Sequence, residues 1–204
     1  MKRVLITAFE PYDRWPENSS WLALVELTRE LPERPQIVTR RYPVHFEKAK
    51  TKLFEDLSTG FDYTIHLGQA PGTSRVQLEA VGLNVGGNSG QRPDEFRVLV
   101  ENAPVAYRTN LPLGSWSEKI RELGIPCQVS YHAGTYLCNA MLYLSQHFAR
   151  QNNWATKSVF VHLPLAPKQV LLERQDVPTL KTEDAARAIR EILKMIDDAE
   201  PMLA

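Results

Sequence analysis

The sequence predicts an α/β fold, a three-layer sandwich in which a mainly parallel, twisted sheet lies between helices. Short apolar segments alternate with longer amphipathic segments along the chain. A chain of 204 residues can bury one core without metal or disulfide crosslinks. The composition, 43% hydrophobic and 24% charged residues, is that of an ordinary globular protein. Because no linker or low-complexity stretch interrupts the pattern, we interpret residues 1–204 as a single domain.

The strands are predicted from short runs of apolar and β-branched residues bounded by proline, glycine or polar residues. The first run stops at Glu10 and Pro11, so it fits a fully buried strand. In chain order the predicted strands are Arg3–Phe9, Gln36–Tyr42, Tyr63–Leu67, Val76–Val85, Arg97–Glu101, Gln128–Tyr131 and Ser158–Leu163.

The helices are predicted from apolar residues that recur with the helical period. They are Ser20–Leu31, Phe46–Leu57, Ser115–Leu123, Thr135–Arg150 and Glu183–Asp197. In the fourth helix, Leu137, Met141, Leu144 and Phe148 form one apolar stripe, which we expect to face the sheet. Most of the prolines fall between these elements, where they cost no ladder hydrogen bond.

The charge pattern excludes several classes of function. Lys plus Arg and Asp plus Glu both number 24, so no net charge attracts nucleic acid or an anionic membrane. The apolar run Val4–Phe9 is shorter than the roughly 7–15 residues of a signal peptide. No run reaches the roughly 20 residues of a membrane span. We therefore expect a cytoplasmic protein with no nucleic-acid or membrane partner.

Four places in this pattern carry unusual residues at the ends of predicted strands. They are the loop after Phe9 and the stretches Leu67–Arg75, Tyr131–Cys138 and His162–Pro167. In α/β folds, sites form where loops leave the carboxyl ends of the strands. We therefore expect the functional residues to come from these segments.

Cys138 is the candidate nucleophile. It lies one residue off the apolar stripe, in the first turn of the predicted helix. There the helix dipole and unpaired backbone N–H groups favour a thiolate and can hold a developing oxyanion. The structural alternative is a small buried hydrophobe. The second cysteine, Cys127, begins a strand and is predicted to pack in the core, and the pair makes no disulfide framework.

His162 is the candidate general base, because it lies at the C-terminal end of the strand Ser158–Leu163. A buried, hydrogen-bonded structural histidine is the alternative. His132 is close enough to Cys138 in sequence to remain a minor rival. No two histidines have the spacing of a metal site, so we predict neither a metal nor another cofactor.

Glu79 is the candidate third member of the site. Its neighbours Leu78, Ala80 and Val81 are apolar, and a carboxylate in such surroundings needs a partner. Orienting His162 and stabilising its imidazolium would supply one. The alternative is a surface glutamate on an edge strand. The glycines of the preceding loop, Gly68 and Gly72, fit neither phosphate-binding motif.

Together these segments resemble the pyroglutamyl-peptidase I (pyrrolidone-carboxyl peptidase) family of cysteine peptidases, in order and over the whole chain. VLITAFEPYDRWPENSSW resembles V-L-x-T-G-F-E-P-F…N-P-S-W, and HLGQAPGTSRVQLEAVGLN resembles G-Q-x-G-G-R followed by E-R-V-A-x-N. APVAYRTNLP is similar to G-P-x-A-Y-x-(S/T)-x-L-P, and VFVHLP to the F-I-H-x-P strand. IPCQVSYHAGTYLCN is similar to G-I-P-x-x-V-S-x-x-A-G-T-(Y/F)-x-C-N.

The resemblance implies a cytosolic omega-peptidase that removes N-terminal pyroglutamate from peptides, without a cofactor. It makes Cys138 the nucleophile, His162 the base and Glu79 the residue that orients the base. The family's pocket implies a second set of residues at the bound ring: Phe9 and Tyr12 as walls, Asn18 near the ring, and Gln69 beside the site. The family often forms tetramers, so the resemblance also implies a homo-oligomer.

The chain departs from the family around the pocket. The segment Val85–Gly90 is shorter than the family's D-A-R-I-P-D-N, so an arginine and an isoleucine of the pocket wall are missing. The arginine of the G-G-R turn is also lost, and Arg75 is a candidate to replace it. Two alternatives therefore stay open: a thiol hydrolase acting on another small acyl or lactam group, and a non-catalytic binding protein. The intact trio of cysteine, histidine and glutamate argues against the second.

Overall fold

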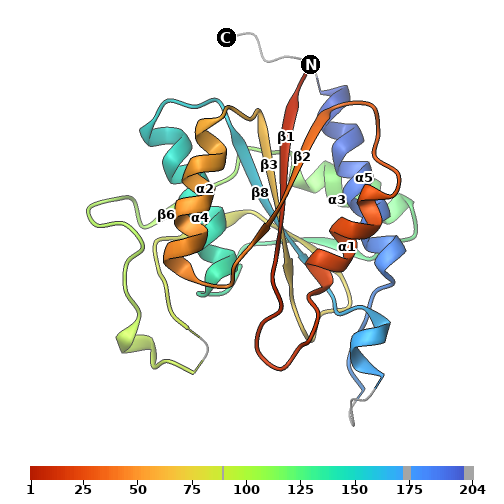
Figure 1. Cartoon of the computed structure of the whole chain (residues 1–204), viewed down its shortest axis with the longest axis horizontal. Coiled ribbons are helices and arrows are strands. Elements are labelled where there is room, and N and C mark those ends of the chain that lie inside the picture. The colour runs from red at the N-terminus through yellow and green to blue at the C-terminus, as the bar shows by residue number, and fades with distance from the viewer. Residues whose placement is uncertain (89, 172–175, 200–204) are drawn as a thin grey trace.

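The computed structural model describes residues 1–88, 90–171 and 176–199 (Figure 1). Its helices are α1 (Ser19–Thr28), α2 (Phe46–Ser58), α3 (Leu113–Glu122), α4 (Leu137–Gln151) and α5 (Thr182–Asp198), with short 3₁₀ helices η1 (Pro93–Glu95) and η2 (Pro167–Val170). Its strands are β1 (Arg3–Phe9), β2 (Gln36–Tyr42), β3 (Tyr63–Gln69), β4 (Val76–Glu79), β5 (Val81–Leu83), β6 (Ala106–Arg108), β7 (Cys127–Ser130) and β8 (Lys157–Leu163).

The central sheet has six strands in the order β2-β1-β3-β8-β4-β7. The first four strands run parallel to one another. β4 runs antiparallel to β8 and parallel to β7, so the last two strands point the opposite way. The prediction of a mainly parallel sheet is therefore confirmed, although the sequence did not reveal the direction of these two strands.

Helices cover both faces of the sheet, which confirms the three-layer arrangement. Figure 1 shows α2 and α4 on one side, and α1, α3 and α5 on the other. Alternate residues of the strands serve the two sides: in β1, Leu5 and Phe9 pack with α2 and α4, whereas Val4 and Ile6 pack with the other layer. No helix among the described residues is long and apolar enough to cross a membrane.

The predicted strand Val76–Val85 is in fact two strands, separated at Ala80. The Ala80 N–H donates to the Ser130 carbonyl (2.7 Å), and β5 then leaves the central sheet to pair with β6. Gly82 explains the new direction of the chain, because a Cβ at this position would lie 2.6 Å from the backbone nitrogen of Tyr143. Glycine thus lets β5 pack directly on the backbone of α4.

The predicted strand Arg97–Glu101 is wrong, since within the described part of the chain this segment makes only an isolated bridge between Arg97 and Gly86. The Asn84 side chain replaces a partner strand: its Oδ1 accepts from the N–H groups of Leu99 (2.9 Å) and Val100 (3.0 Å). Its Nδ2 donates to the Val100 carbonyl (2.8 Å). β6, with three residues, was not predicted because it is too short to show a period.

The helix ends differ from the prediction by up to three residues, and two of the differences have a clear cause. α1 ends at Thr28 rather than Leu31, in keeping with Pro32, which disfavours helical backbone at the residue before it. α4 begins at Leu137 rather than Thr135, because Tyr136 has extended backbone angles (φ −94°, ψ −153°). The later start brings Cys138 to the second position of the helix.

Candidate active site

Cys138 lies in the first turn of α4, directly over β3. A Cβ added to Gly68 of β3 would be 3.1 Å from Cys138 Sγ and 2.4 Å from the ring of Phe160. The absence of a side chain at Gly68 therefore gives room to the sulfur and to the aromatic ring beneath it. The backbone N–H of Ala140 is the first in the helix to bond within it, to the Tyr136 carbonyl, so the N–H groups of the first turn can stabilise an anion at the sulfur.

The register of the sheet brings His162 and Glu79 together. His162 of β8 is opposite Gly68 of β3 in the parallel pair and opposite Gln77 of β4 in the antiparallel pair. Glu79 lies two residues along β4 from Gln77, on the same face of the sheet. His162 Nδ1 is 2.7 Å from Glu79 Oε1, and both side chains are almost completely buried.

The imidazole of His162 is held as a cation. Burial by itself lowers the pKa of His162, but charge and hydrogen-bond interactions with Cys138 and Glu79 outweigh this effect and raise the pKa to about 10. Since Nδ1 faces Glu79, Nε2 is the nitrogen left for the thiol. The arrangement thus places the Cys138 side chain beside an imidazolium that a buried carboxylate orients.

A small pocket opens beside Cys138. It encloses about 320 Å³, including its mouth to solvent. Its lining residues are Phe9, Tyr12, Asn18, Val44, Gln69, Tyr136, Leu137 and Cys138. The structure therefore brings the four predicted pocket residues together with the predicted nucleophile.

Three lining residues were missed at the sequence level. Tyr136 and Leu137 directly precede Cys138. Their place at the predicted start of the helix was the feature of the sequence that could have identified them as pocket residues. Val44 follows the carboxyl end of β2, at the edge where the other parallel strands contribute residues. The rule that sites form at this edge would have identified it.

The Asn18 side chain makes hydrogen bonds to the loop and helix residues around it. Its Oδ1 accepts from the Ser20 N–H (3.0 Å) and hydroxyl (2.7 Å), which caps α1. Its Nδ2 donates to the Glu10 carbonyl (3.0 Å). Asn18 therefore fixes the loop between β1 and α1 at the pocket.

Gln69 differs from Asn18 in that, within the described part of the chain, only one end of its amide makes hydrogen bonds of normal geometry. Its Oε1 accepts from the Ser19 N–H (2.8 Å), whereas its Nε2 is buried and makes no hydrogen bond of normal geometry with the described residues. Near it, burial and the charge of Cys138 raise the pKa of Tyr12 to about 12, and the Gln69 amide partly offsets this effect. Tyr12 is therefore a neutral phenol at the pocket.

The rival candidates lie elsewhere. His132 is exposed, and its Nδ1 accepts a hydrogen bond from the Gly134 N–H (2.9 Å). Cys127 is 3% exposed, and burial raises the pKa of its thiol. Arg75 is exposed and does not line the pocket, and its only hydrogen bonds within the described residues join its backbone to Thr73.

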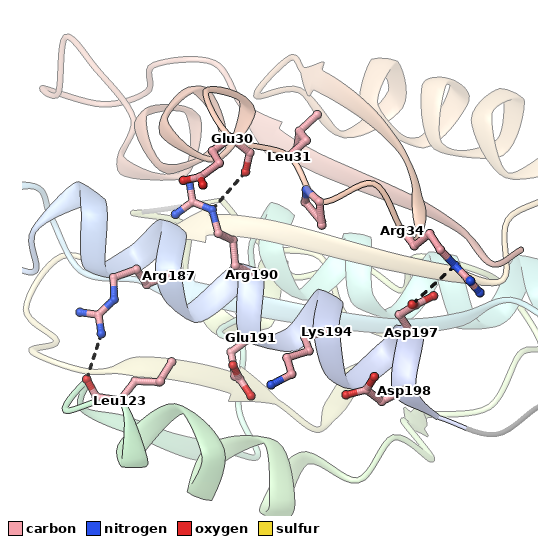
Figure 2. A pocket seen from close by; sticks show the side chains of 11 residues that line it. Glu30, Leu31, Arg34, Leu123, Arg187, Arg190, Glu191, Lys194, Asp197 and Asp198 are labelled. Atoms are coloured by element: carbon pink, nitrogen blue, oxygen red, sulfur yellow. Dashed lines mark hydrogen bonds and ion pairs between the residues drawn. The ribbon is translucent and has the colours of Figure 1, made fainter.

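A second hollow lies on the other side of the sheet, between α5 and the segment that follows α1 (Figure 2). Arg34 pairs there with Asp197 (3.8 Å), and Arg190 donates to the Glu30 carbonyl (3.2 Å). Among the described residues that line it there is neither cysteine nor histidine, so it offers no thiol and no imidazole base. Within residues 1–88, 90–171 and 176–199, no group of three or more His, Cys, Asp or Glu side chains could hold a metal ion.

Comparisons with known proteins identify the family of this chain. The family model described as pyroglutamyl peptidase matches residues 2–198. A pyrrolidone-carboxylate peptidase of Pseudomonas fluorescens is 35% identical over 189 residues, covering 89% of this chain and 87% of that protein. Its counterpart from Brachyspira hyodysenteriae is 30% identical over 198 residues, covering 94% and 97%. The crystal structure of pyrrolidone carboxyl peptidase from Fervidobacterium islandicum has a TM-score of 0.90 at 30% identity and covers 96% of this chain and 98% of that one. This chain therefore belongs to the pyroglutamyl peptidase family.

Proposed function

We propose that this chain is a cysteine exopeptidase that hydrolyses the amide bond after an N-terminal pyroglutamyl residue of a peptide. The observation that carries the proposal is the position of Cys138. It lies in the first turn of α4, next to the buried His162–Glu79 pair and at the wall of a small, mostly apolar pocket. The names of the relatives favour this activity over hydrolysis of another acyl group or a non-catalytic role.

In the proposed reaction the Cys138 thiolate attacks the carbonyl carbon of the pyroglutamyl residue. The N–H groups in the first turn of α4 stabilise the oxyanion of the tetrahedral intermediate. His162 gives its proton to the departing amine as the C–N bond breaks, which leaves a thioester on the sulfur. His162 then takes a proton from water, whose oxygen attacks the thioester and releases pyroglutamate and the thiolate.

The chemistry of the pocket suits a pyroglutamyl ring. The ring is small, flat and neutral, so apolar walls such as Phe9, Tyr12 and Leu137 can pack against it. Gln69 Nε2, which has no hydrogen bond of normal geometry within the described residues, is a buried donor for the lactam carbonyl. No carboxylate is among the described lining residues, which fits a substrate without a terminal ammonium.

The test is hydrolysis of fluorogenic amides. The chain should release the fluorophore from a pyroglutamyl amide, and far more slowly from prolyl and alanyl amides, which lack the lactam carbonyl. Cys138→Ala serves as the control for contaminating peptidases. Equal rates on all three amides would favour another acyl substrate, and no cysteine-dependent hydrolysis of any amide would favour a non-catalytic role.

A further inference from the structure

We propose that Gln169 is a positioning residue that fixes the orientation of the Gln69 carboxamide and so makes the pocket select rings bearing a carbonyl group. The inference rests on the proposed function. Gln169 belongs to η2, the short helix that follows the strand carrying His162. Gln169 Nε2 lies 2.8 Å from Gln69 Oε1, although the two residues are far apart in sequence.

The orientation of Gln169 is set by two backbone groups. Its Oε1 accepts from the N–H of Ala166 (2.8 Å), and its Nε2 donates to the carbonyl of Glu17 (2.9 Å). A backbone N–H can only donate and a carbonyl can only accept, so the side chain cannot exchange its oxygen and nitrogen without losing both bonds. The nitrogen of Gln169 therefore faces Gln69.

The fixed nitrogen of Gln169 in turn orients the carboxamide of Gln69. Its Oε1 receives the second Nε2 hydrogen of Gln169 and the backbone N–H of Ser19 (2.8 Å), two donors for two lone pairs. A reversed carboxamide would oppose its NH₂ group to both donors. Nε2 is therefore forced to the other side, where it is buried without a hydrogen bond among the described residues.

The consequence concerns substrate selection. With this orientation Gln69 offers an N–H to the pocket, which matches the lactam carbonyl of a pyroglutamyl ring. With the reversed orientation it would offer a carbonyl oxygen and repel the same group. The Ser19 N–H alone opposes the reversal with one bond, and Gln169 adds the second.

The test compares substitutions at Gln169. In Gln169→Glu the new carboxylate keeps an acceptor for the Ala166 N–H but places an oxygen against Gln69 Oε1, which favours the reversed amide. In Gln169→Met both the bond and the repulsion are absent. Because the lactam carbonyl is remote from the bond that breaks, we expect KM for a pyroglutamyl amide to rise roughly tenfold in Gln169→Glu and by less in Gln169→Met, with kcat nearly unchanged.

Lys168→Ala is the matched control. Lys168 Nζ ties the same segment to the same residue, Glu17 (2.9 Å), without touching Gln69. We expect an unchanged KM in this variant, and an unchanged rate of Cys138 alkylation by iodoacetamide in all three variants. The slow hydrolysis of a prolyl amide, which has no lactam carbonyl, should also stay constant.

Three outcomes would overturn the inference. An equal rise in KM for Lys168→Ala would assign the effect to anchoring of the segment. An unchanged KM in both Gln169 variants would show that Ser19 alone suffices. A fall in kcat and alkylation rate together would assign the effect to the catalytic groups. Failure of the unsubstituted protein to cleave a pyroglutamyl amide would instead overturn the proposed function, and this inference with it.

Discussion

The two cysteines of this chain have very different surroundings. Cys138 lies at a helix N-terminus, beside a pocket and a protonated histidine. Cys127 is enclosed in β7, where burial raises the pKa of its thiol. The position of each cysteine in the fold therefore decides how reactive its thiol is.

The first prediction concerns this contrast. Iodoacetamide should modify Cys138 much faster than Cys127, because the thiolate is the reactive form and Cys138 adjoins the pocket. Peptide mass spectrometry over a time course measures both sites in one sample. Comparable labelling of Cys127 in the folded protein would contradict the assignment of the nucleophile. Cys138→Ala should abolish hydrolysis and leave the thermal unfolding transition in place.

The second prediction concerns Glu79. Glu79→Gln removes the charge that helps to hold His162 as a cation, so the pKa of His162 should fall from about 10. Loss of orientation should lower kcat by about 10²–10⁴-fold. The imidazole C–H signals in NMR follow the titration, with the exposed His132 as the internal control.

The interactions of His162 with Cys138 and Glu79 contribute to stability with a defined pH dependence. The pKa of His162 is raised from an ordinary 6.5 to about 10, so this stabilisation is complete below pH 6.5 and is lost as pH rises to about 10. The difference in free energy of unfolding between the parent and Glu79→Gln should therefore shrink across this interval. A constant difference measured in urea at pH 6, 8 and 10 would contradict the charged pair.

The sequence allowed candidate residues to be predicted where residue type and local position indicate a chemistry, and the structure brings these candidates together. Cys138, His162 and Glu79 each stand at a recognisable place in a helix or strand, and the pocket residues came from the family motifs. Gln169 was missed because its significance depends on partners at Glu17 and Gln69, which only the folded chain brings near. The exposed position of Arg75 gives no support to its suggested replacement of the lost arginine.

At the scale of elements, the start of α4 is held by β5. Asn139, the residue after Cys138, is fully buried, and its Oδ1 accepts from the Leu83 N–H (2.8 Å). Its Nδ2 donates to the carbonyls of Leu83 (2.9 Å) and Val85 (2.9 Å). One amide thus joins the helix that carries Cys138 to the strand that follows Glu79.

The third prediction tests this joint. Asn139→Ala leaves a backbone N–H and two carbonyls without their partner, so the free energy of unfolding should fall by roughly 1–3 kcal/mol. Urea denaturation measures the change. Asn152→Ala is the comparison, because among the residues described its Nδ2 bonds only to the Phe148 carbonyl of its own helix, near the surface. An equal loss of unfolding free energy in both variants would show that the bonds between α4 and β5 contribute no more than a bond within α4.

Element type was predictable where the hydrophobic period was long, as in α2, α4 and α5. The prediction of element type was wrong where side-chain hydrogen bonds replace those of a partner strand, as the bonds of Asn84 do at Leu99 and Val100. The division of Val76–Val85 depended on Gly82 meeting α4, a contact between segments distant in sequence.

At the scale of the whole molecule, the sheet separates two apolar cores, and the site lies on the face that packs with α2 and α4. The ring of Phe160 lies on this face. It stacks on the rings of Phe9 and His66, with distances between ring centroids of 6.3 Å and 6.2 Å, and its centroid lies 4.8 Å from that of the His162 ring. The fold class could be predicted from the alternation of strand and helix patterns along the chain. The strand order and the reversed β4 and β7 did not, because connections alone do not fix pairing.

The fourth prediction concerns stability in acid. His66 is fully buried, its Nδ1 lies 2.7 Å from the Thr7 hydroxyl, and burial lowers its pKa to about 3. The unfolded chain takes up a proton below an ordinary pKa of 6.5, so stability conferred by neutral His66 is present above pH 6.5 and lost toward pH 3. This group should contribute a loss of about 1.4 kcal/mol per pH unit below pH 6.

The measurement is the free energy of unfolding at pH 6.5, 5.5 and 4.5. His66→Gln should show a shallower dependence than the parent, whatever its absolute stability. His132→Gln is the exposed control and should follow the parent. Parallel curves for the parent and His66→Gln would contradict a neutral buried histidine.

The Asn84 side chain closes the base of an excursion that leaves β5 and returns before β6. Its bonds go to backbone groups of Leu99 and Val100, so they do not depend on which residues, or how many, stand between. This is the region in which the chain is shorter than its family's pattern, although Ser89 lies outside the described residues. Insertions and deletions can therefore accumulate there during descent while Cys138, His162 and Glu79 keep their geometry. The excursion between β5 and β6 is free to diversify, and one hydrolytic machinery can be inherited beside many different forms of it.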